Sequence, residues 1–399
     1  MKAVKTIAAL IFLTAIGIVL IQPVLGADDG PIRKKAKHVA AQSPDAEETP
    51  GSEPSPGGEE EAELTLLARY PKQCMTERLV AQAELVAARR GSSVSLGLPG
   101  QDPPQARFGV SGDVVWSPSG SYLAERGGEL FDISGTPLGR MFFESTKWQW
   151  SVGDCVVALT GDGNLTFGIP ETRLGVRLAK APISDFELSP NGRRMALVVD
   201  GGLWIADLRR GRATLAGPER ASLVGWFSNR TVLYTKSEGS GRLRFVTGTG
   251  NAGIVKGAFA GATLARCTGR TLLAAPDAPL AELVSHKGKV RSEALPGTPA
   301  TYAGFSDASC SPDGGFIVAS ALTSPGEKGP LVLLGSDGTF VREIMRGRTA
   351  NPTWTSQGVL FVKFGGSGRG RLWFIPPNGA PAPTAYTVGA PNQYDWAAR

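Results

Sequence analysis

Acidic and amide side chains recur at one position of a repeated pattern, three residues before a recurring apolar or cysteine residue. The members of this column are Asp113, Asp185, Asp307, Asn351 and Gln393. If a repeat brings equivalent positions to one place, gathered carboxylates focus a negative potential and bind a cationic ligand or a basic peptide. The alternative is that each side chain caps its own turn and forms no shared site. The column is interrupted by Lys147, Leu223 and Leu264, so any acidic rim is one-sided.

Residues typical of catalysis are scarce. The chain holds only His38 and His286 as histidines, and no Gly-x-Ser-x-Gly motif precedes a predicted helix, so a serine hydrolase triad is not indicated. No His or Cys cluster has the spacing of zinc ligands. The segments Gly161–Asn164 and Ser336–Thr339 resemble calcium loops but lack the spaced acidic ligands, which favours hairpin turns. The sequence therefore predicts a protein with no metal, no cofactor and no enzymatic activity.

The cysteines are Cys74, Cys155, Cys267 and Cys310. Cys267 and Cys310 stand at matching positions of consecutive repeats, where such residues are usually buried. One interpretation has three buried thiols in strands and a free thiol at Cys74. The other is a disulfide between Cys74 and Cys155, which an exported chain permits and which would fasten the leading segment to the repeats.

The acidic column belongs to a repeat whose clearest copies contain a Ser-Pro turn. These copies are WSPSGSYLAE from Trp116, LSPNGRRMALVVD from Leu188 and CSPDGGFIVAS from Cys310. Pro, Asp or Asn and Gly favour a tight turn, and an apolar strand follows it. Weaker copies begin at Trp150, Trp226, Cys267 and Trp354. The first residue of each copy, here called the anchor, therefore recurs at intervals of roughly 40 residues.

A second strand signature follows each anchor, as in LWIADL from Leu203 and RLWFIP from Arg371. Four short strands per repeat with Gly-rich turns are typical of a β-propeller blade, because one such sheet must stack on its neighbours to bury both faces. The anchors predict an all-β fold, a seven-bladed β-propeller of four-stranded blades, with six or eight blades as alternatives. Trp396, one further repeat along, predicts a terminal strand that helps to close the ring.

The segment LSPNGRRMALVVDGGLWIADLRRGR (Leu188–Arg212) resembles a blade of the TolB-type, WD-repeat-like propellers of bacteria. The resemblance extends over about residues 108–399 and is carried by the Ser-Pro turns and the Leu-Trp strands. It implies a propeller that docks partners in the cell envelope. TolB has an additional N-terminal α/β domain, and the short leading segment here does not match it. The resemblance therefore predicts architecture better than it predicts a role.

The sequence before the repeats divides into three segments. Residues 1–26 hold two lysines and then a long apolar run, which predicts a secretory signal peptide or an uncleaved membrane anchor. Residues 27–63 are basic and then rich in Pro, Ser and Glu, which predicts a disordered linker. Residues 64–100 contain TERLVAQAELVAARRG from Thr76, whose spacing predicts a helix in a helical lead segment. Residues 101–399 are the predicted propeller.

The net charge of +6 does not indicate nucleic-acid binding, because the basic residues occur as scattered pairs rather than as a stripe interleaved with aromatic residues. We expect a monomeric, exported or membrane-anchored propeller that binds an envelope protein, a peptide or another ligand. Its compartment would be the periplasm or another extracytoplasmic space, with membrane contact through the N-terminal segment if that segment is not cleaved. The alternative function is a propeller hydrolase or lyase that acts on a glycan or peptide at the channel mouth.

Overall fold

The structure, a computed structural model, describes residues 63–396 except for short internal stretches. These stretches are 67–69, 77–84, 100–103, 126, 142–144, 173, 181, 218–219, 237–241, 258–261, 268, 287–288, 356, 367, 378, 389 and 391–393. The predicted signal or anchor segment, nearly all of the predicted linker and Gln393 lie outside the described residues. Within those residues, no helix has the length and apolar character needed to span a membrane.

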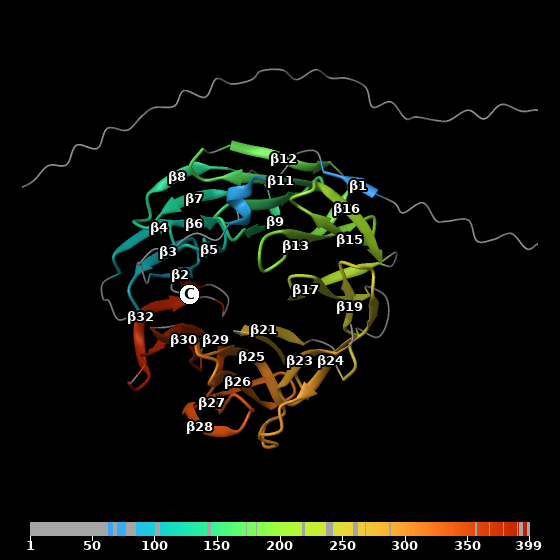
Figure 1. Cartoon of the computed structure of the whole chain (residues 1–399). Coiled ribbons are helices and arrows are strands. Elements are labelled where there is room, and N and C mark those ends of the chain that lie inside the picture. The colour runs from blue at the N-terminus through green and yellow to red at the C-terminus, as the bar shows by residue number, and fades with distance from the viewer. Residues whose placement is uncertain are drawn as a thin grey trace, which may run out of the picture. The chain divides into compact units, whose positions relative to one another are not determined.

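Eight antiparallel sheets surround a common axis, and each sheet forms one blade of a β-propeller (Figure 1). The strands are given from the axis outward. Blade 1 is β33 (Tyr394–Trp396), β2 (Val86–Arg90), β3 (Ser93–Gly97) and β4 (Ala106–Gly109), and blade 2 is β5 (Val114–Trp116), β6 (Tyr122–Glu125), β7 (Glu129–Asp132) and β8 (Pro137–Arg140). Blade 3 is β9 (Ser145–Trp150), β10 (Val156–Thr160), β11 (Asn164–Ile169) and β12 (Leu174–Lys180), and blade 4 is β13 (Ile183–Leu188), β14 (Arg194–Val199), β15 (Gly202–Asp207) and β16 (Arg212–Gly217). Blade 5 is β17 (Ala221–Ser228), β18 (Thr231–Lys236), β19 (Arg244–Thr247) and β20 (Ala252–Ile254), and blade 6 is β21 (Thr263–Cys267), β22 (Arg270–Ala274), β23 (Ala281–His286) and β24 (Lys289–Ala294). Blade 7 is β25 (Gly304–Cys310), β26 (Phe316–Ser324), β27 (Glu327–Gly335) and β28 (Phe340–Met345), and blade 8 is β29 (Thr349–Thr355), β30 (Gly358–Phe364), β31 (Gly370–Ile375) and β32 (Ala382–Val388).

The Ser-Pro turns join the first and second strands of their blades, as the sequence predicts. In blade 7 the Ser311 hydroxyl accepts a hydrogen bond from the backbone amide of Phe316 at 2.9 Å, and Gly314 has a φ of +73°. Only a residue without a side chain adopts that backbone conformation readily, which explains the glycine at this place. The same serine-to-backbone bond forms in blade 4, where the amide of Arg194 donates to the Ser189 hydroxyl at 2.9 Å.

The expected number of seven blades is wrong, because the structure has eight. Trp396 ends β33, and β33 pairs with β2 in the register Val86 to Trp396. The last anchor therefore belongs to a complete blade whose other three strands precede the first anchor in the sequence. Counting anchors misses this blade, because its inner strand and its outer strands lie at opposite ends of the repeat region.

The predicted helix from Thr76 is also corrected by the structure. Val86–Arg90, the last part of that segment, forms the strand β2, and the part at 77–84 lies outside the described residues. Ala87 packs into the core between blades 1 and 2, whereas Val86 packs into the core between blades 8 and 1. Because β2 is buried on both faces, its consecutive residues are apolar, and such a run is also compatible with a helix.

A separate hydrophobic cluster fills each junction between neighbouring blades. The largest side chains that are fully buried include the anchors Trp116 and Trp226 and the inner-strand residue Phe186. Alternate residues of a strand point to opposite faces, so each blade contributes to two of these clusters. The core is thus a ring of junctions, and each junction fixes the inner strands next to it.

The leading segment packs against blades 3 and 4. The strand β1 (Glu63–Thr65) adds to the outer edge of blade 4 by pairing with β16. Tyr70 is buried in the same cluster as residues of both blades, and the short 3-10 helix η1 (Lys72–Met75) follows it. A Cβ atom at Gly153 would lie 1.9 Å from the carbonyl oxygen of Gln73, so only glycine permits this contact.

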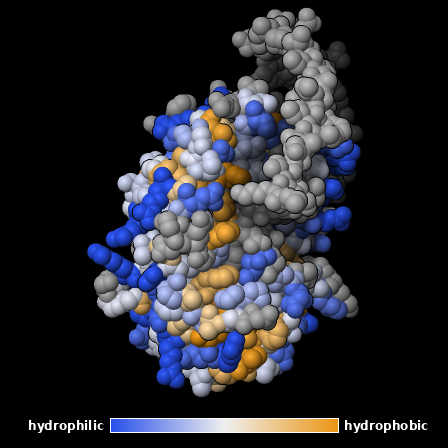
Figure 2. Space-filling view, turned by 90° about the vertical axis from the view of Figure 1, so that its left-hand side faces the viewer, coloured by the Kyte–Doolittle hydropathy of each residue, from blue (hydrophilic) through white to orange (hydrophobic). Residues whose placement is uncertain are grey.

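The outer surface carries apolar side chains among polar ones. Figure 2 shows apolar patches separated by hydrophilic residues on the face that it views. The exposed large apolar residues of the described chain are Leu98, Ile133, Val176, Leu215, Ile254, Phe316, Phe340 and Val341. They come from many different blades, so they do not define one docking face.

Candidate functional site

The inner strands are linked by a hydrogen bond that recurs from blade to blade. The side chain one position before an anchor accepts a bond from the backbone amide of the next anchor. The N–O distances are 2.9 Å from Leu188 to Gln149, 3.0 Å from Trp354 to Ser309 and 2.8 Å from Trp116 to Asp395. Side chains on this face of the inner strand are therefore aimed at the following blade. The column of predicted rim residues, two positions earlier, shares that face.

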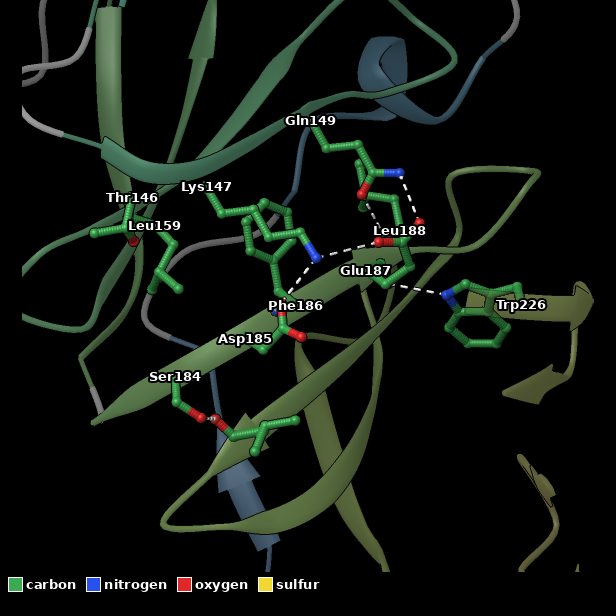
Figure 3. A network of polar contacts seen from close by, with 11 residues as sticks. Thr146, Lys147, Gln149, Leu159, Ser184, Asp185, Phe186, Glu187, Leu188 and Trp226 are labelled. Carbon is green, nitrogen blue, oxygen red and sulfur yellow. Dashed lines mark hydrogen bonds and ion pairs between the residues drawn. The ribbon is translucent and has the colours of Figure 1, made fainter. Parts of the chain in front are cut away.

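The junction between blades 3 and 4 holds a network of charged side chains (Figure 3). The Lys147 ammonium lies 2.8 Å from Oδ1 of Asp185 and 3.4 Å from Oε2 of Glu187. The Gln149 side-chain amide donates to Oε1 of Glu187 at 3.2 Å, and the Lys147 ammonium also stands 5.6 Å from the centre of the Phe186 ring. One cation thus serves two carboxylates, and we call these residues the neutralised sector.

Asp113 is likewise paired with a cation. Its Oδ1 forms an ion pair with the guanidinium of Arg89, which comes from β2 of the preceding blade. Asp113 also lines a hollow of about 380 Å³ between blades 2 and 3, together with Lys147 and Trp148. Lys147 in the lining and Arg89, the ion-pair partner of Asp113, reduce the attraction of this hollow for a further cation.

Asp307 differs, because its hydrogen-bond donors are uncharged. Its Oδ2 accepts the Ser306 hydroxyl at 2.8 Å and the backbone amide of Asn351 in blade 8 at 3.3 Å. Within the described part of the chain, no ion pair involves Asp307. The side chain is half-buried, so its charge is partly removed from water without a cation beside it.

Asp395 contributes a second carboxylate on the other side of blade 8. Tyr394, its neighbour in β33, donates a short hydrogen bond to the carbonyl oxygen of Asn351 and lies 3.2 Å from the Thr353 hydroxyl. Burial raises the pKa of Tyr394, and the charges of Asp395 and Asp307 raise it further. Both carboxylates therefore act on one buried phenol. We call Asp307, Asp395 and Tyr394 the acidic sector.

The structure places Asp113, Asp185 and Asp307 at equivalent positions of three blades, but it gives them different partners. Arg89 pairs with Asp113, Lys147 pairs with Asp185, and Asp307 faces a backbone amide. Asn351, the asparagine of the column, has a φ of +50°, and its backbone amide is the one that donates to Asp307. A second column, one position before the anchors, holds Asp395, Glu187 and Arg266, which were not predicted as site residues. Comparing that second column would have found all three.

The possible metal sites of the sequence include the two loops at 161–164 and 336–339, which resemble calcium loops. Among the described residues, no group of His, Cys, Asp and Glu has the arrangement of a metal site. The two predicted hairpin turns are formed, between β10 and β11 and between β27 and β28. A hydrogen bond from Thr160 lowers the pKa of Asp162, and the backbone amide of Thr339 does the same for Asp337. These turn carboxylates are therefore used locally.

The cysteines form two disulfides, so the interpretation with unpaired thiols is wrong. One bond joins Cys74 in η1 to Cys155 beside β10, and the other joins Cys267 to Cys310 at the ends of two inner strands. No free cysteine is present among the described residues. The first bond fastens the leading segment to blade 3, and the second links blades 6 and 7.

Comparison with known proteins identifies the fold only. No family model and no curated protein matches the chain. Among solved structures, the dihydro-heme d1 dehydrogenase NirN is similar with a TM-score of 0.56 and 13% identity, over 87% of this chain and 84% of that one. A dipeptidyl peptidase 4 from Porphyromonas gingivalis has a TM-score of 0.50 and 12% identity, over 69% and 53%. A putative TolB from Agrobacterium tumefaciens has a TM-score of 0.36 and 14% identity, over 56% and 89%.

These similarities establish a β-propeller, and TolB-like and WD40 propellers occur among the matches. The expectation that the chain has no enzymatic activity must be corrected, because propellers of similar shape include a dehydrogenase and a peptidase. Identities of 12% and 13% show a shared fold and not a shared activity. The function must therefore be argued from the inner wall of this chain itself.

Proposed function

We propose that this chain is an exported propeller that binds a cationic group, an amine or guanidinium of an envelope protein or peptide, at its acidic sector. The observation that carries the proposal is the carboxylate of Asp307, whose hydrogen-bond donors are all uncharged. Asp395, whose Oδ2 accepts the backbone amide of Trp116 in blade 2, acts with Asp307 on the phenol of Tyr394, whose pKa is raised first by burial and then by these two charges. A cation placed there would gain the charge interaction that Lys147 already supplies in the neutralised sector.

The balance of charge along the inner wall supports this proposal. Among the described residues of the inner strands, four carboxylates stand against two cations: Asp185, Glu187, Asp307 and Asp395 against Lys147 and Arg266. The whole chain has a net charge of +6, so this acidic wall opposes the general balance. Basic ligands would be steered toward it, with an association that weakens as salt is added.

The disulfides support the proposed compartment. Disulfides persist in oxidising spaces and are rare in the reducing cytosol. The apolar run in residues 1–26 provides the means of export. Thiol labelling of the cellular protein after denaturation tests this part of the proposal. Four blocked cysteines in an envelope fraction are expected, whereas four reactive thiols in the cytosol would contradict export.

The binding proposal is tested with a labelled hexalysine peptide and fluorescence anisotropy. The substitution Asp307→Asn keeps the size and the acceptor atom but removes the charge, and we expect it to weaken binding about two- to fivefold, the range of a partly exposed ion pair. The matched control is Asp162→Asn, which removes one charge from the hairpin turn between β10 and β11 in blade 3. Equal losses in the two variants would show general charge attraction and refute a site at Asp307.

A further inference from the structure

A second hollow, of about 570 Å³, lies where the inner strands of blades 5 and 6 end. It differs from the acidic sector in charge, because its polar wall carries two arginines, Arg266 and Arg270. Phe227 and Leu283 supply apolar surface to the same hollow. Its volume is within the range of sites for small organic ligands, about 300–1,000 Å³. We call it the blade 5–6 hollow.

Arg266 has a charge that the protein leaves without a direct partner. It makes no hydrogen bond and no ion pair with any described residue. Arg266 is exposed to solvent within the hollow. Partial desolvation lowers the pKa of Arg266, while the charge of Glu187 in blade 4 opposes that shift. Gly225, which holds the equivalent position in blade 5, offers no side chain to complement it. An arginine stays protonated in such a place, so it favours an anion.

Arg270 reinforces this positive wall. One of its terminal nitrogens donates to the carbonyl oxygen of Ser336 in blade 7 at 2.7 Å, which fixes the guanidinium in place. The other terminal nitrogen is enclosed and has no hydrogen-bond partner among the described residues. An unsatisfied charged donor is costly in a protein, and an anion in the adjoining hollow would reduce that cost.

Asn229 adds a donor whose orientation is set by the fold. Its side-chain oxygen accepts the backbone amide of Asn191 in blade 4 at 3.1 Å. This bond assigns the oxygen to blade 4 and leaves the amide nitrogen as the group available to a ligand in the hollow. Arginine and amide donors together suit the oxygen atoms of an acid.

The charge of the lining limits which acid fits. Glu282 also lines the hollow, so the two arginines face one carboxylate and the net charge of these side chains is +1. A doubly charged phosphate would meet repulsion from Glu282, whereas a single carboxylate would balance the remaining charge. The apolar surface of Phe227 and Leu283 requires an apolar or aromatic body attached to that carboxylate.

We propose that the blade 5–6 hollow binds a small monocarboxylate with an apolar or aromatic body, held by Arg266 and Asn229. This site goes beyond the proposed function, because its ligand has the opposite charge and its residues belong to other blades. It also gives the molecule two sites of opposite preference, one for cations at blades 7, 8 and 1 and one for anions where the inner strands of blades 5 and 6 end.

Calorimetric titration of the purified chain with N-acetylphenylalanine tests this site. We expect saturable binding with one ligand per chain, while N-acetylphenylalaninamide, which lacks the charge, and phenyl phosphate bind more weakly. Arg266→Gln should weaken the binding of the carboxylate at least tenfold. Arg342→Gln, which removes an exposed arginine from the outer strand β28, is the matched control and should leave the affinity unchanged.

A second variant separates charge from folding. Asn229→Asp keeps the acceptor for the Asn191 amide and places a negative charge at the hollow, so it should abolish carboxylate binding without lowering the melting temperature. The proposal is overturned if N-acetylphenylalanine does not bind the wild-type chain, if Arg266→Gln and Arg342→Gln behave alike, or if phenyl phosphate binds more tightly than the carboxylate.

Discussion

The neutralised sector and the acidic sector are built from equivalent positions of the same repeat, yet their electrostatics differ. In blades 3 and 4, Lys147 stands between Asp185 and Glu187 and satisfies both. In blades 7, 8 and 1, the same column presents Asp307 to a backbone amide, and Asp395 lies beyond it. The identity of one residue in the column therefore decides whether the carboxylates of a junction are paired with a lysine of the protein itself or remain able to bind an external cation.

The two sectors also differ in how they are fixed. The neutralised sector is backed by the leading segment and its disulfide to blade 3. The acidic sector depends on β33, a strand of three residues whose Tyr394 reaches into blade 8. A short closing strand has few backbone bonds, so the buried phenol carries much of the attachment.

The largest expected effect is therefore at Tyr394. Tyr394→Ala removes a buried ring and its hydrogen bonds, and we expect a loss of about 3–5 kcal/mol in the free energy of unfolding. Tyr394→Phe keeps the ring and should lose about 1 kcal/mol. Urea denaturation measures both. A loss for Tyr394→Ala no greater than that for Tyr394→Phe would show that β33 does not hold the ring closed.

Removing the disulfide of the leading segment should have the next largest effect. Replacing Cys74 and Cys155 by serine is expected to cost about 2–4 kcal/mol. Because the acidic sector lies in other blades, hexalysine binding should not change. Denaturation and anisotropy on the same double variant test the two statements together, and weaker peptide binding would show that the sectors are coupled.

Alkaline pH should weaken the two places where a buried tyrosine holds a segment to the ring, the closing strand at Tyr394 and the leading segment at Tyr70. Burial raises the pKa of both Tyr394 and Tyr70 above the value of the unfolded chain, so the folded state keeps protons that the unfolded state loses. Stability is then fully retained below about pH 10 and falls above it by up to about 1.4 kcal/mol per pH unit for each tyrosine. Denaturation at increasing pH should show a shallower decline for Tyr394→Phe than for the wild type. Parallel declines would assign the effect to other groups.

The smallest expected effect on stability is at Lys147. Lys147→Gln should cost less than about 1 kcal/mol, because the side chain is partly exposed and its ion pairs are screened. It should nevertheless convert the neutralised sector into a second acidic one and strengthen hexalysine binding about twofold to fivefold. Lys289→Gln, on the outer strand β24, provides the control. No gain in the first variant would break the comparison between the sectors.

The repeat and its strands could be predicted from sequence because each anchor, turn and strand is a local pattern. The inner strands end at or near the predicted anchors, including Trp116 and Leu188. The eighth blade could not be counted in this way, since β2 lacks a Ser-Pro turn and finds its inner partner β33 only after the ring closes. An apolar run such as Val86–Ala88 is compatible with either a helix or a strand until its neighbours are known.

The candidate site was predictable in position but not in charge balance. Spacing placed Asp113, Asp185 and Asp307 in one column of the repeat. Their partners come from other blades: Arg89 belongs to blade 1, and the amide that faces Asp307 belongs to blade 8. Such pairings depend on the register between blades, which no local pattern encodes.

The position of β33 sets an order of events during synthesis. A ribosome completes the strands of blades 2 to 8 before it makes Tyr394–Trp396, so β2 waits without its inner neighbour while the rest of the chain emerges. During that interval the apolar faces of Val86 and Leu360, which later share a core, have no closing strand between blades 8 and 1. The growing chain therefore exposes apolar surface between blades 8 and 1. Whether it folds without aggregating depends on how quickly the last strand is made, or on chaperones that cover this surface until then.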